Sequence, residues 1–188
     1  NGRSGMVWET AKGPCLVRDS QMNNNAAMGV ALATAYNFTF ENCQIKFNAK
    51  GQFEIAAKPR PIAFIGPGKK SGSYGASDFT AAVGEHPYNR VGMMGNRFLT
   101  IHNCTIATKD REKAPFFIHH YGKQDLYARY FTEQYDAKNN VYISPENSVA
   151  FDTHEGDYHK IELVSFEQWQ QWTGSEDGSQ WREHGTAD

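Results

Sequence analysis

The sequence has few of the features that mark a membrane or nucleic-acid-binding protein. No apolar run approaches the roughly 18 residues that a membrane span needs. The longest basic cluster is Lys69-Lys70, and the formal net charge is -2 at pH 7. That is too little positive charge to hold a phosphate backbone. We therefore expect neither a membrane nor a nucleic acid as a partner.

Cysteine is also scarce. The sequence contains only Cys15, Cys43 and Cys104, and none of them forms a CxxC pair. An odd number of cysteines cannot make a closed disulfide framework. We predict three free thiols that act as small buried side chains, with a Cys43–Cys104 disulfide as the alternative.

Metal ligands are not arranged in a recognisable pattern. His119 and His120 are adjacent, so on a strand they face opposite sides and cannot bind one ion. Residues 152–157 are rich in oxygen atoms but do not have the spaced ligands of a known calcium loop. We expect no metal and no cofactor, with Ca²⁺ at residues 152–157 as the alternative.

The sequence does contain an internal repeat. Residues 5–11 recur as 29–35 at an offset of 24, and residues 15–22 recur as 38–45 at an offset of 23. Residues 98–106 repeat the Asn-Cys-x-Ile end of the second copy. A period near 23 with short alternating strands is too short for a pair of helices. It predicts a parallel β-solenoid with one turn per repeat, and the alternative is a chance similarity within a β-sandwich.

The repeat predicts which residues are buried. Alternate residues of a strand face the same side, so Phe38 and Phe40 should face the interior. Stacked repeats bring Asn42 and Asn103 to equivalent turns, where asparagine tolerates a left-handed backbone.

The repeat is interrupted once and ends in a helix. Between Arg60 and Arg97 the prolines and glycines break any strand pattern, which predicts a long inserted loop at 61–97. Such loops are usually functional. Residues 165–174 predict a short helix that Ser165 caps and Gly174 ends. We treat 1–188 as one domain and expect it to be part of a longer chain, with the remainder upstream of Asn1.

The Asn-Cys-x-Ile ends at 42–45 and 103–106 resemble those of the pectate-lyase-like right-handed parallel β-helix superfamily. Residues 139–188 resemble the ending of secreted bacterial β-helix carbohydrate enzymes. They contain an Asn-Asn-x-Tyr strand, a Ser-Phe-x-x-Trp-Gln-x-x-Thr-Gly helix and an acidic segment with serine. The resemblance implies an all-β fold, namely a right-handed parallel β-helix (solenoid) with one long inserted loop and a short C-terminal helix. It also implies a secreted or periplasmic location.

A second similarity concerns residues 8–17, which look like a strand of β-helix glycoside hydrolases of the β-xylosidase and α-fucosidase type. In such enzymes two carboxylates on neighbouring coils do the chemistry. The similarity implies that Glu9 is catalytic and that Trp8, with Tyr74 and Tyr88 of the loop, shapes the sugar site. One repeat after Glu9 stands Ala33, so a partner on the preceding coil would lie upstream of Asn1.

We therefore expect hydrolysis of glycosidic bonds in an extracellular polysaccharide or oligosaccharide. The first alternative is a polysaccharide lyase acting on an acidic glycan. In that case Lys58, Arg60, Arg90 and Arg97, which flank the loop, would form a basic cleft. The second alternative is a non-catalytic carbohydrate-binding solenoid, such as a tailspike or adhesin shaft. Whether the chain is an enzyme is left open by the sequence, because one fold hosts many chemistries.

Overall fold

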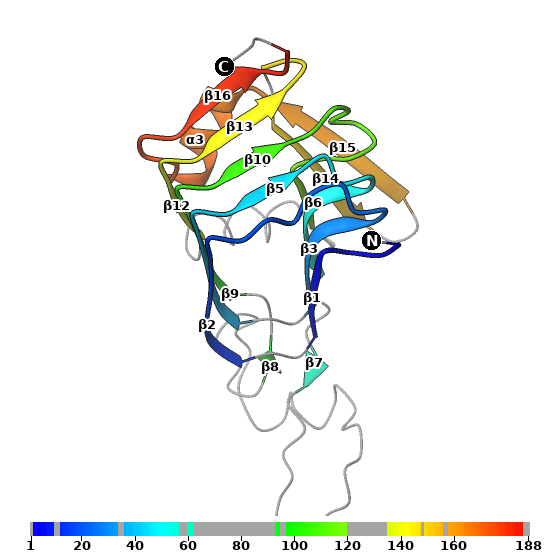
Figure 1. The fold of residues 1–188 in the computed structure, drawn as a ribbon, viewed down its shortest axis with the longest axis vertical. Coiled ribbons are helices and arrows are strands. Elements are labelled where there is room, and N and C mark those ends of the chain that lie inside the picture. Colours follow the sequence, from blue (N-terminus) through cyan, green and yellow to red (C-terminus); the bar gives the residue numbers. More distant parts are fainter. Residues whose placement is uncertain are drawn as a thin grey trace, which may run out of the picture.

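The computed structural model describes residues 2–9, 12–33, 36–56, 60–61, 93–94, 97–119, 135–147, 149–155 and 158–185 (Figure 1). This part of the chain forms three larger sheets, one two-stranded sheet and one α-helix. We name the larger sheets A, B and C. Their strand orders are β1-β3-β6-β11-β14-β15 in sheet A, β12-β9-β4-β2 in sheet B and β16-β13-β10-β5 in sheet C.

The elements have the following bounds. Sheet A contains β1 (Met6–Glu9), β3 (Met28–Ala33), β6 (Gly51–Ala56), β11 (Phe117–His119), β14 (Val149–Glu155) and β15 (Tyr158–Val164). Sheet B contains β2 (Lys12–Arg18), β4 (Tyr36–Glu41), β9 (Arg97–His102) and β12 (Tyr135–Lys138). Sheet C contains β5 (Gln44–Lys46), β10 (Thr105–Ala107), β13 (Val141–Ser144) and β16 (Gln180–Glu183). The remaining elements are β7 (Arg60–Pro61), β8 (Met93–Met94) and α3 (Phe166–Thr173).

The chain visits the three sheets in turn. We call a stretch that contributes a strand to sheet A, then B, then C a pass; the second pass is β3, β4 and β5, and the third is β6, β9 and β10. Strands of successive passes pair in parallel, with Cys15 opposite Phe38 and Phe38 opposite Leu99. The predicted parallel pairing of residues 15–17, 38–40 and 99–101 is therefore confirmed.

The prediction of a right-handed parallel β-helix is wrong. The described strands form separate sheets, and none of these sheets closes or curls on itself. Sheet A ends in the antiparallel pair β14–β15, which a uniform parallel coil does not contain. At the base of the predicted 61–97 loop, β7 and β8 also pair in antiparallel fashion. The physical reason is that a period near 23 specifies which strands pair, and it does not specify how the sheets join or end.

Among the residues that the structure describes, one buried cluster fills the interior. Phe38 and Phe40 are buried as predicted, and they lie in register with Leu99 and Ile101 of the next pass. The Phe40 ring contacts the Phe53 ring of sheet A with centroids 5.4 Å apart, so side chains of different sheets share one core. Burial of such side chains contributes about 1.5–3 kcal/mol each.

The corner between sheets B and C repeats one backbone conformation. Asp19, Asn42, Asn103 and Asn139 all have a φ between 52° and 55°. Asn and Asp tolerate this left-handed region better than most residues. The Asn42 N–H donates to the His102 carbonyl (3.1 Å), and the Asn103 N–H donates to the Lys138 carbonyl (3.0 Å). The predicted equivalence of Asn42 and Asn103 is confirmed.

The residue that follows each left-handed position forms a buried polar ladder. The Cys43 N–H donates to Cys104 Sγ (3.4 Å), and the Cys104 N–H donates to Asn140 Oδ1 (2.9 Å). The Asn140 N–H donates to Ser179 Oγ (2.8 Å). Each backbone donor thus finds its acceptor on the next pass, and this arrangement satisfies groups that burial would otherwise leave unpaired.

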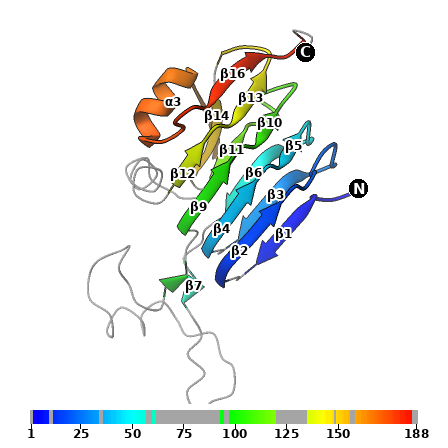
Figure 2. The ribbon, with the colours of Figure 1, turned by 60° about the vertical axis from the view of Figure 1, so that its left-hand side comes forward.

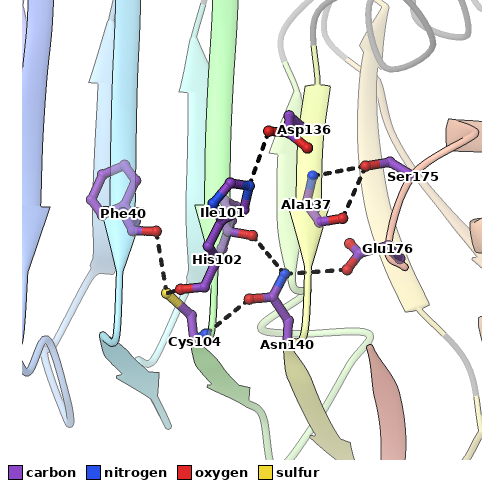
Figure 3. Close-up of polar contacts among 9 residues, drawn as sticks. All are labelled: Phe40, Ile101, His102, Cys104, Asp136, Ala137, Asn140, Ser175 and Glu176. Carbon is purple, nitrogen blue, oxygen red and sulfur yellow. Dashed lines mark hydrogen bonds and ion pairs between the residues drawn. The ribbon is translucent and has the colours of Figure 1, made fainter. Parts of the chain in front are cut away.

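The ladder side chains also donate in the opposite direction. Cys104 Sγ donates to the Phe40 carbonyl (3.6 Å), and Asn140 Nδ2 donates to the Ile101 carbonyl (2.8 Å), so each reaches the preceding pass (Figure 3). Cys43 Sγ makes the same bond to Val17 (3.5 Å). All three cysteines are free thiols, as predicted.

A second ladder lies at the corner between sheets C and A. Asn48 Oδ1 accepts the Asn25 N–H (2.9 Å) and Asn25 Nδ2 (2.8 Å), and Asn48 Nδ2 donates to Gln52 Oε1 (2.9 Å). A Cβ on Gly29 would lie 2.6 Å from Asn48 Nδ2 and 2.8 Å from the Gln52 carbonyl. Glycine at this position therefore makes room for the amide ladder.

The predicted C-terminal helix is confirmed. Ser165 Oγ accepts the Gln168 N–H (3.1 Å), and Gln168 Oε1 accepts the Ser165 N–H (3.0 Å), which completes a capping box. Gly174 ends the helix with a φ of 61°. Phe166 and Trp169 are buried, so one face of α3 packs on the core. No helix in the described part of the chain is long and apolar enough to cross a membrane.

The ladder generates a stability prediction. Cys104→Val has nearly the same shape but cannot accept the Cys43 N–H, so we expect the free energy of unfolding to fall by about 1–3 kcal/mol. Cys104→Ser keeps both a donor and an acceptor and should lose less. Urea unfolding of the two variants checks this, and a valine variant at least as stable as the serine variant would contradict it.

Candidate functional site

Four of the residues that the sequence assigned to a sugar site fall outside the described part of the chain. These are Lys58, Tyr74, Tyr88 and Arg90. Arg60 begins β7 and pairs with Met94 of β8, at the base of the predicted loop. The proposed basic cleft for an acidic sugar therefore stays a prediction.

Trp8 and Glu9 lie on β1, at the edge of sheet A. Trp8 pairs with the buried Leu32, and its ring meets the Phe38 ring edge-on at a centroid distance of 5.5 Å. Trp8 thus belongs to a row of side chains that packs on the core, although 39% of its surface is exposed. Glu9 pairs with Ala33, as the repeat predicted, so the register gives it no neighbouring carboxylate on the second pass.

The described residues contain no group of three or more His, Cys, Asp or Glu side chains that could hold a metal ion. Residues 152–155, the described part of the alternative calcium segment, belong to β14. The structure therefore shows no metal-binding group in the part of the chain that it describes.

A buried carboxylate that the sequence did not single out lies under α3. Glu176 is fully buried, and its Oε1 accepts hydrogen bonds from the Tyr135 hydroxyl (2.6 Å), the Tyr142 hydroxyl (2.5 Å) and Trp169 Nε1 (3.1 Å). Its Oε2 accepts a bond from Asn140 Nδ2 at 3.2 Å (Figure 3). Four donors from β12, the β12–β13 turn, β13 and α3 thus meet at one anion.

The surroundings of Glu176 raise the pKa values of Tyr135 and Tyr142. Burial raises the pKa of both Tyr135 and Tyr142 well above the usual value, and the nearby charge of Glu176 raises them further. Both hydroxyls therefore stay protonated and can donate to the carboxylate. Because the cluster is buried and its carboxylate is fully engaged, we assign it a structural role: it ties α3 to sheets B and C.

The cysteine pair is also engaged inside the fold. Cys43 and Cys104 are both buried, and the neighbouring Cys104 side chain lowers the pKa of Cys43 to about 7. A thiol with such a pKa can be reactive when it is accessible. Here both sulfur atoms are members of the polar ladder, so we assign them to the fold rather than to catalysis.

The outer face of sheet B carries two pairs of polar side chains that bind each other. Arg18 lies 3.0 Å from Glu41, and His102 Nε2 lies 3.0 Å from Asp136 Oδ2. Exposed pairs of this kind add little stability. They also leave little net charge on this face with which to attract a ligand.

The outer face of sheet C differs, because a lysine lies over an aromatic ring there. Lys46, Ala107, Ile143 and Arg182 lie in register on the four neighbouring strands, which cross the front of the molecule in Figure 1, and of these Ala107 is buried. Phe47, the residue that follows Lys46, has a left-handed backbone (φ 58°). We call this surface, together with Phe47, Lys109 and His184, the sheet C face.

Phe47 contacts a lysine and a histidine. The Lys109 ammonium lies 5.1 Å from the centre of the Phe47 ring, and the His184 ring meets it edge-on at 5.4 Å. Asp110, the acidic neighbour of Lys109, instead pairs with Lys113 at 3.1 Å. The sheet C face therefore combines an apolar centre with a basic rim, a combination that suits an anionic ligand with an apolar surface.

The sequence did not indicate the sheet C face, because its members lie far apart along the chain. The only available signal was the repeat itself, which brings Lys46 onto the same row as Arg182 once the register is known. No family model, curated protein or solved structure matches this chain.

Glu176→Gln tests the structural role of the buried carboxylate. The variant loses the charge, and one side-chain oxygen becomes an amide that cannot accept the Asn140 donor. We expect a loss of about 2–4 kcal/mol in the free energy of unfolding. Urea unfolding measures it, with Glu112→Gln in an exposed turn as the matched control. If Glu176→Gln is as stable as Glu112→Gln, the structural role assigned to Glu176 is wrong.

The raised pKa values of Tyr135 and Tyr142 predict that the folded protein loses stability at alkaline pH. Their pKa values are raised in the folded state, so stability is fully present below the usual tyrosine pKa of about 10. Above that pH the unfolded chain releases protons that the folded chain retains, so the free energy of unfolding falls by about 1.4 kcal/mol per pH unit for each tyrosine. Urea unfolding between about pH 8 and 11 checks the slope, and Tyr142→Phe should make it shallower.

Proposed function

We propose that this chain binds a carboxylate-bearing polysaccharide or oligosaccharide outside the cytoplasm, on the sheet C face. The observation that carries the proposal is the contact of the Phe47 ring with both Lys109 and His184. Sugar rings present apolar C–H faces that pack on aromatic rings, and the carboxylates of acidic sugars form charge-assisted bonds with lysine. The resemblance to secreted carbohydrate-handling proteins agrees with this assignment.

The regular spacing of the strands supports an extended ligand. Neighbouring strands of a sheet lie about 4.8 Å apart, and one sugar residue of a linear glycan advances by a similar length. The row from Lys46 to Arg182 crosses the four strands of sheet C. A glycan lying along this row would meet a basic residue at each end and the half-buried Ile143 between them, because Ala107 is buried.

Lys109→Gln tests the binding site. Loss of one charge-assisted contact should weaken the affinity for an oligogalacturonate about tenfold, measured by isothermal titration calorimetry. Lys138→Gln makes the same charge change on exposed β12 of sheet B and should leave the affinity unchanged. Binding to the wild type should also weaken with added salt.

Three results would count against binding at this face. One is equal affinity for oligogalacturonate and for uncharged xylo-oligosaccharides. Another is an equal effect of Lys109→Gln and Lys138→Gln. The third is no measurable binding of either ligand to the wild-type chain.

Hydrolysis by Glu9 is the second candidate, favoured by its position on the edge strand β1. Two carboxylates about 5–9.5 Å apart are needed for this chemistry. Glu9→Gln keeps the shape and removes the charge and the proton. If Glu9 is the acid or the nucleophile, the variant protein should lose turnover of xylan-, fucan- and uronate-type oligosaccharides by at least about a thousandfold.

Product analysis distinguishes hydrolysis from the lyase alternative. A lyase product carries a new carbon–carbon double bond that absorbs in the ultraviolet, and a hydrolysis product does not. Turnover that is unchanged in Glu9→Gln would exclude the residue from the chemistry.

A further inference from the structure

Two parallel rows of side chains cross the sheet C face, and they differ in charge. The strands β16, β13, β10 and β5 lie side by side in that order (Figure 2), and residues that alternate with the buried Ile45, Ile106 and Tyr142 face outward. The first row, which we call the amide row, contains Gln21, Gln44, Thr105, Val141 and Gln180. The second, which we call the basic row, contains Lys46, Ala107, Ile143 and Arg182.

The amide row offers hydrogen bonds without charge. Gln21 and Gln180 are exposed, and Gln44 and Thr105 are half-buried. None of these side chains makes a hydrogen bond to another residue in the described part of the chain. Amides and hydroxyls both donate and accept hydrogen bonds, so this row suits the hydroxyl groups of a sugar.

The corner beyond the amide row adds no positive charge. It is formed by exposed left-handed residues, namely Asp19, Asn42, Asn103 and Asn139. Asn42 Nδ2 donates to Asp19 Oδ1 (3.2 Å), and this aspartate is the one ionisable residue among them. Arg18 and Lys138, which precede this corner, lie on strands of sheet B. A ligand carboxylate placed over this edge would therefore lose hydration without gaining a cation.

The opposite edge of the face carries the cations. Lys109 and His184 contact Phe47 just beyond the basic row. Glu183 is in register with the buried Ser144, so it faces the other side of sheet C. Two residues along a strand span about 6.7 Å, which is close to the width of a sugar ring. A glycan laid across the strands thus has one edge over the amide row and the other over the basic row.

This difference between the two edges restricts where the acidic groups of a glycan can be. In a cellulose-type ribbon each sugar is turned over relative to the previous one, so equivalent substituents alternate between the two edges of the chain. A chain made only of uronic acids would place half of its carboxylates over the amide row. If every second sugar is acidic, all carboxylates lie along one edge, and the other edge presents only uncharged groups.

We infer that the ligand of the sheet C face is a glycan with a cellulose-type backbone that carries a carboxylate on every second sugar. Its carboxylates lie along the basic row and Lys109, and its uncharged edge binds the amide row. Gln44 and Gln180 determine specificity, because a cation at either position would accept an acid on the second edge. The inference rests on the proposed glycan binding and adds which distribution of acid the face selects.

Three hexasaccharides with the same cellulose backbone test the inference by isothermal titration calorimetry. One contains only glucose, one alternates glucose with glucuronate, and one contains only glucuronate. Charge alone would make the fully acidic hexasaccharide bind most tightly. We expect the alternating hexasaccharide to bind about fivefold or more tighter than each of the other two.

Gln44→Lys tests the amide row directly. A lysine there supplies a cation to the uncharged edge, so the affinity for the fully acidic hexasaccharide should rise about tenfold. The affinity for the alternating hexasaccharide should change by less than about twofold, because its second edge has no carboxylate. Thr39→Lys adds the same charge on the outer face of sheet B and should leave the ratio of the two affinities unchanged.

The outcomes distinguish the inference from the proposed function. If the fully acidic hexasaccharide binds as tightly as the alternating one or more tightly, the inference is wrong and binding of acidic glycans still stands. An equal effect of Gln44→Lys and Thr39→Lys on that ratio would also overturn the inference. If the uncharged hexasaccharide binds as tightly as both acidic ones, the proposed function fails and the inference fails with it.

Discussion

The structure depends on one corner that is repeated in every pass. A left-handed residue turns the chain between sheets B and C. In the second pass and the two after it, the next residue (Cys43, Cys104 or Asn140) places a small hydrogen-bonding side chain into the interior. Backbone donors at this corner are buried, so an apolar side chain there would leave them unpaired, at roughly 1–3 kcal/mol each. This requirement restricts the corner to side chains such as those of Ser, Cys and Asn, whereas the strands between corners tolerate many apolar residues.

Beside α3 the aromatic core ends at the buried Glu176 carboxylate rather than at another apolar layer. Phe117 stacks on Trp169, and the same indole donates to Glu176, so α3 is held by packing and by hydrogen bonds together. A buried anion is destabilising unless all its lone pairs are used. Tyr135, Tyr142, Trp169 and Asn140 use them here, which makes the position of the helix specific as well as stable.

Features that depend on local chemistry and on the repeat could be predicted from the sequence. The strand register, the left-handed Asn42 and Asn103 and the two ends of α3 each follow from a few neighbouring residues. The antiparallel β14–β15 pair and the open sheets could not be predicted, because the repeat carries no information about where it stops. The role of Glu176 and the sheet C face depend on contacts between distant segments. Phe47 has a left-handed backbone, and phenylalanine as a residue type gives no indication of that conformation.

The chain turns at one corner between sheets A and B and at another between sheets B and C. These two corners differ in how readily they accept inserted residues. In the second pass β3 ends at Ala33 and β4 begins at Tyr36, whereas in the third pass β6 ends at Ala56 and β9 begins only at Arg97. The pairing of β4 with β9 keeps its register despite this difference. Loop-closure entropy grows only slowly with length, so this corner can lengthen at little loss of stability. The ladder corner has no such freedom, because an inserted residue there would separate each buried backbone donor from its acceptor on the next pass.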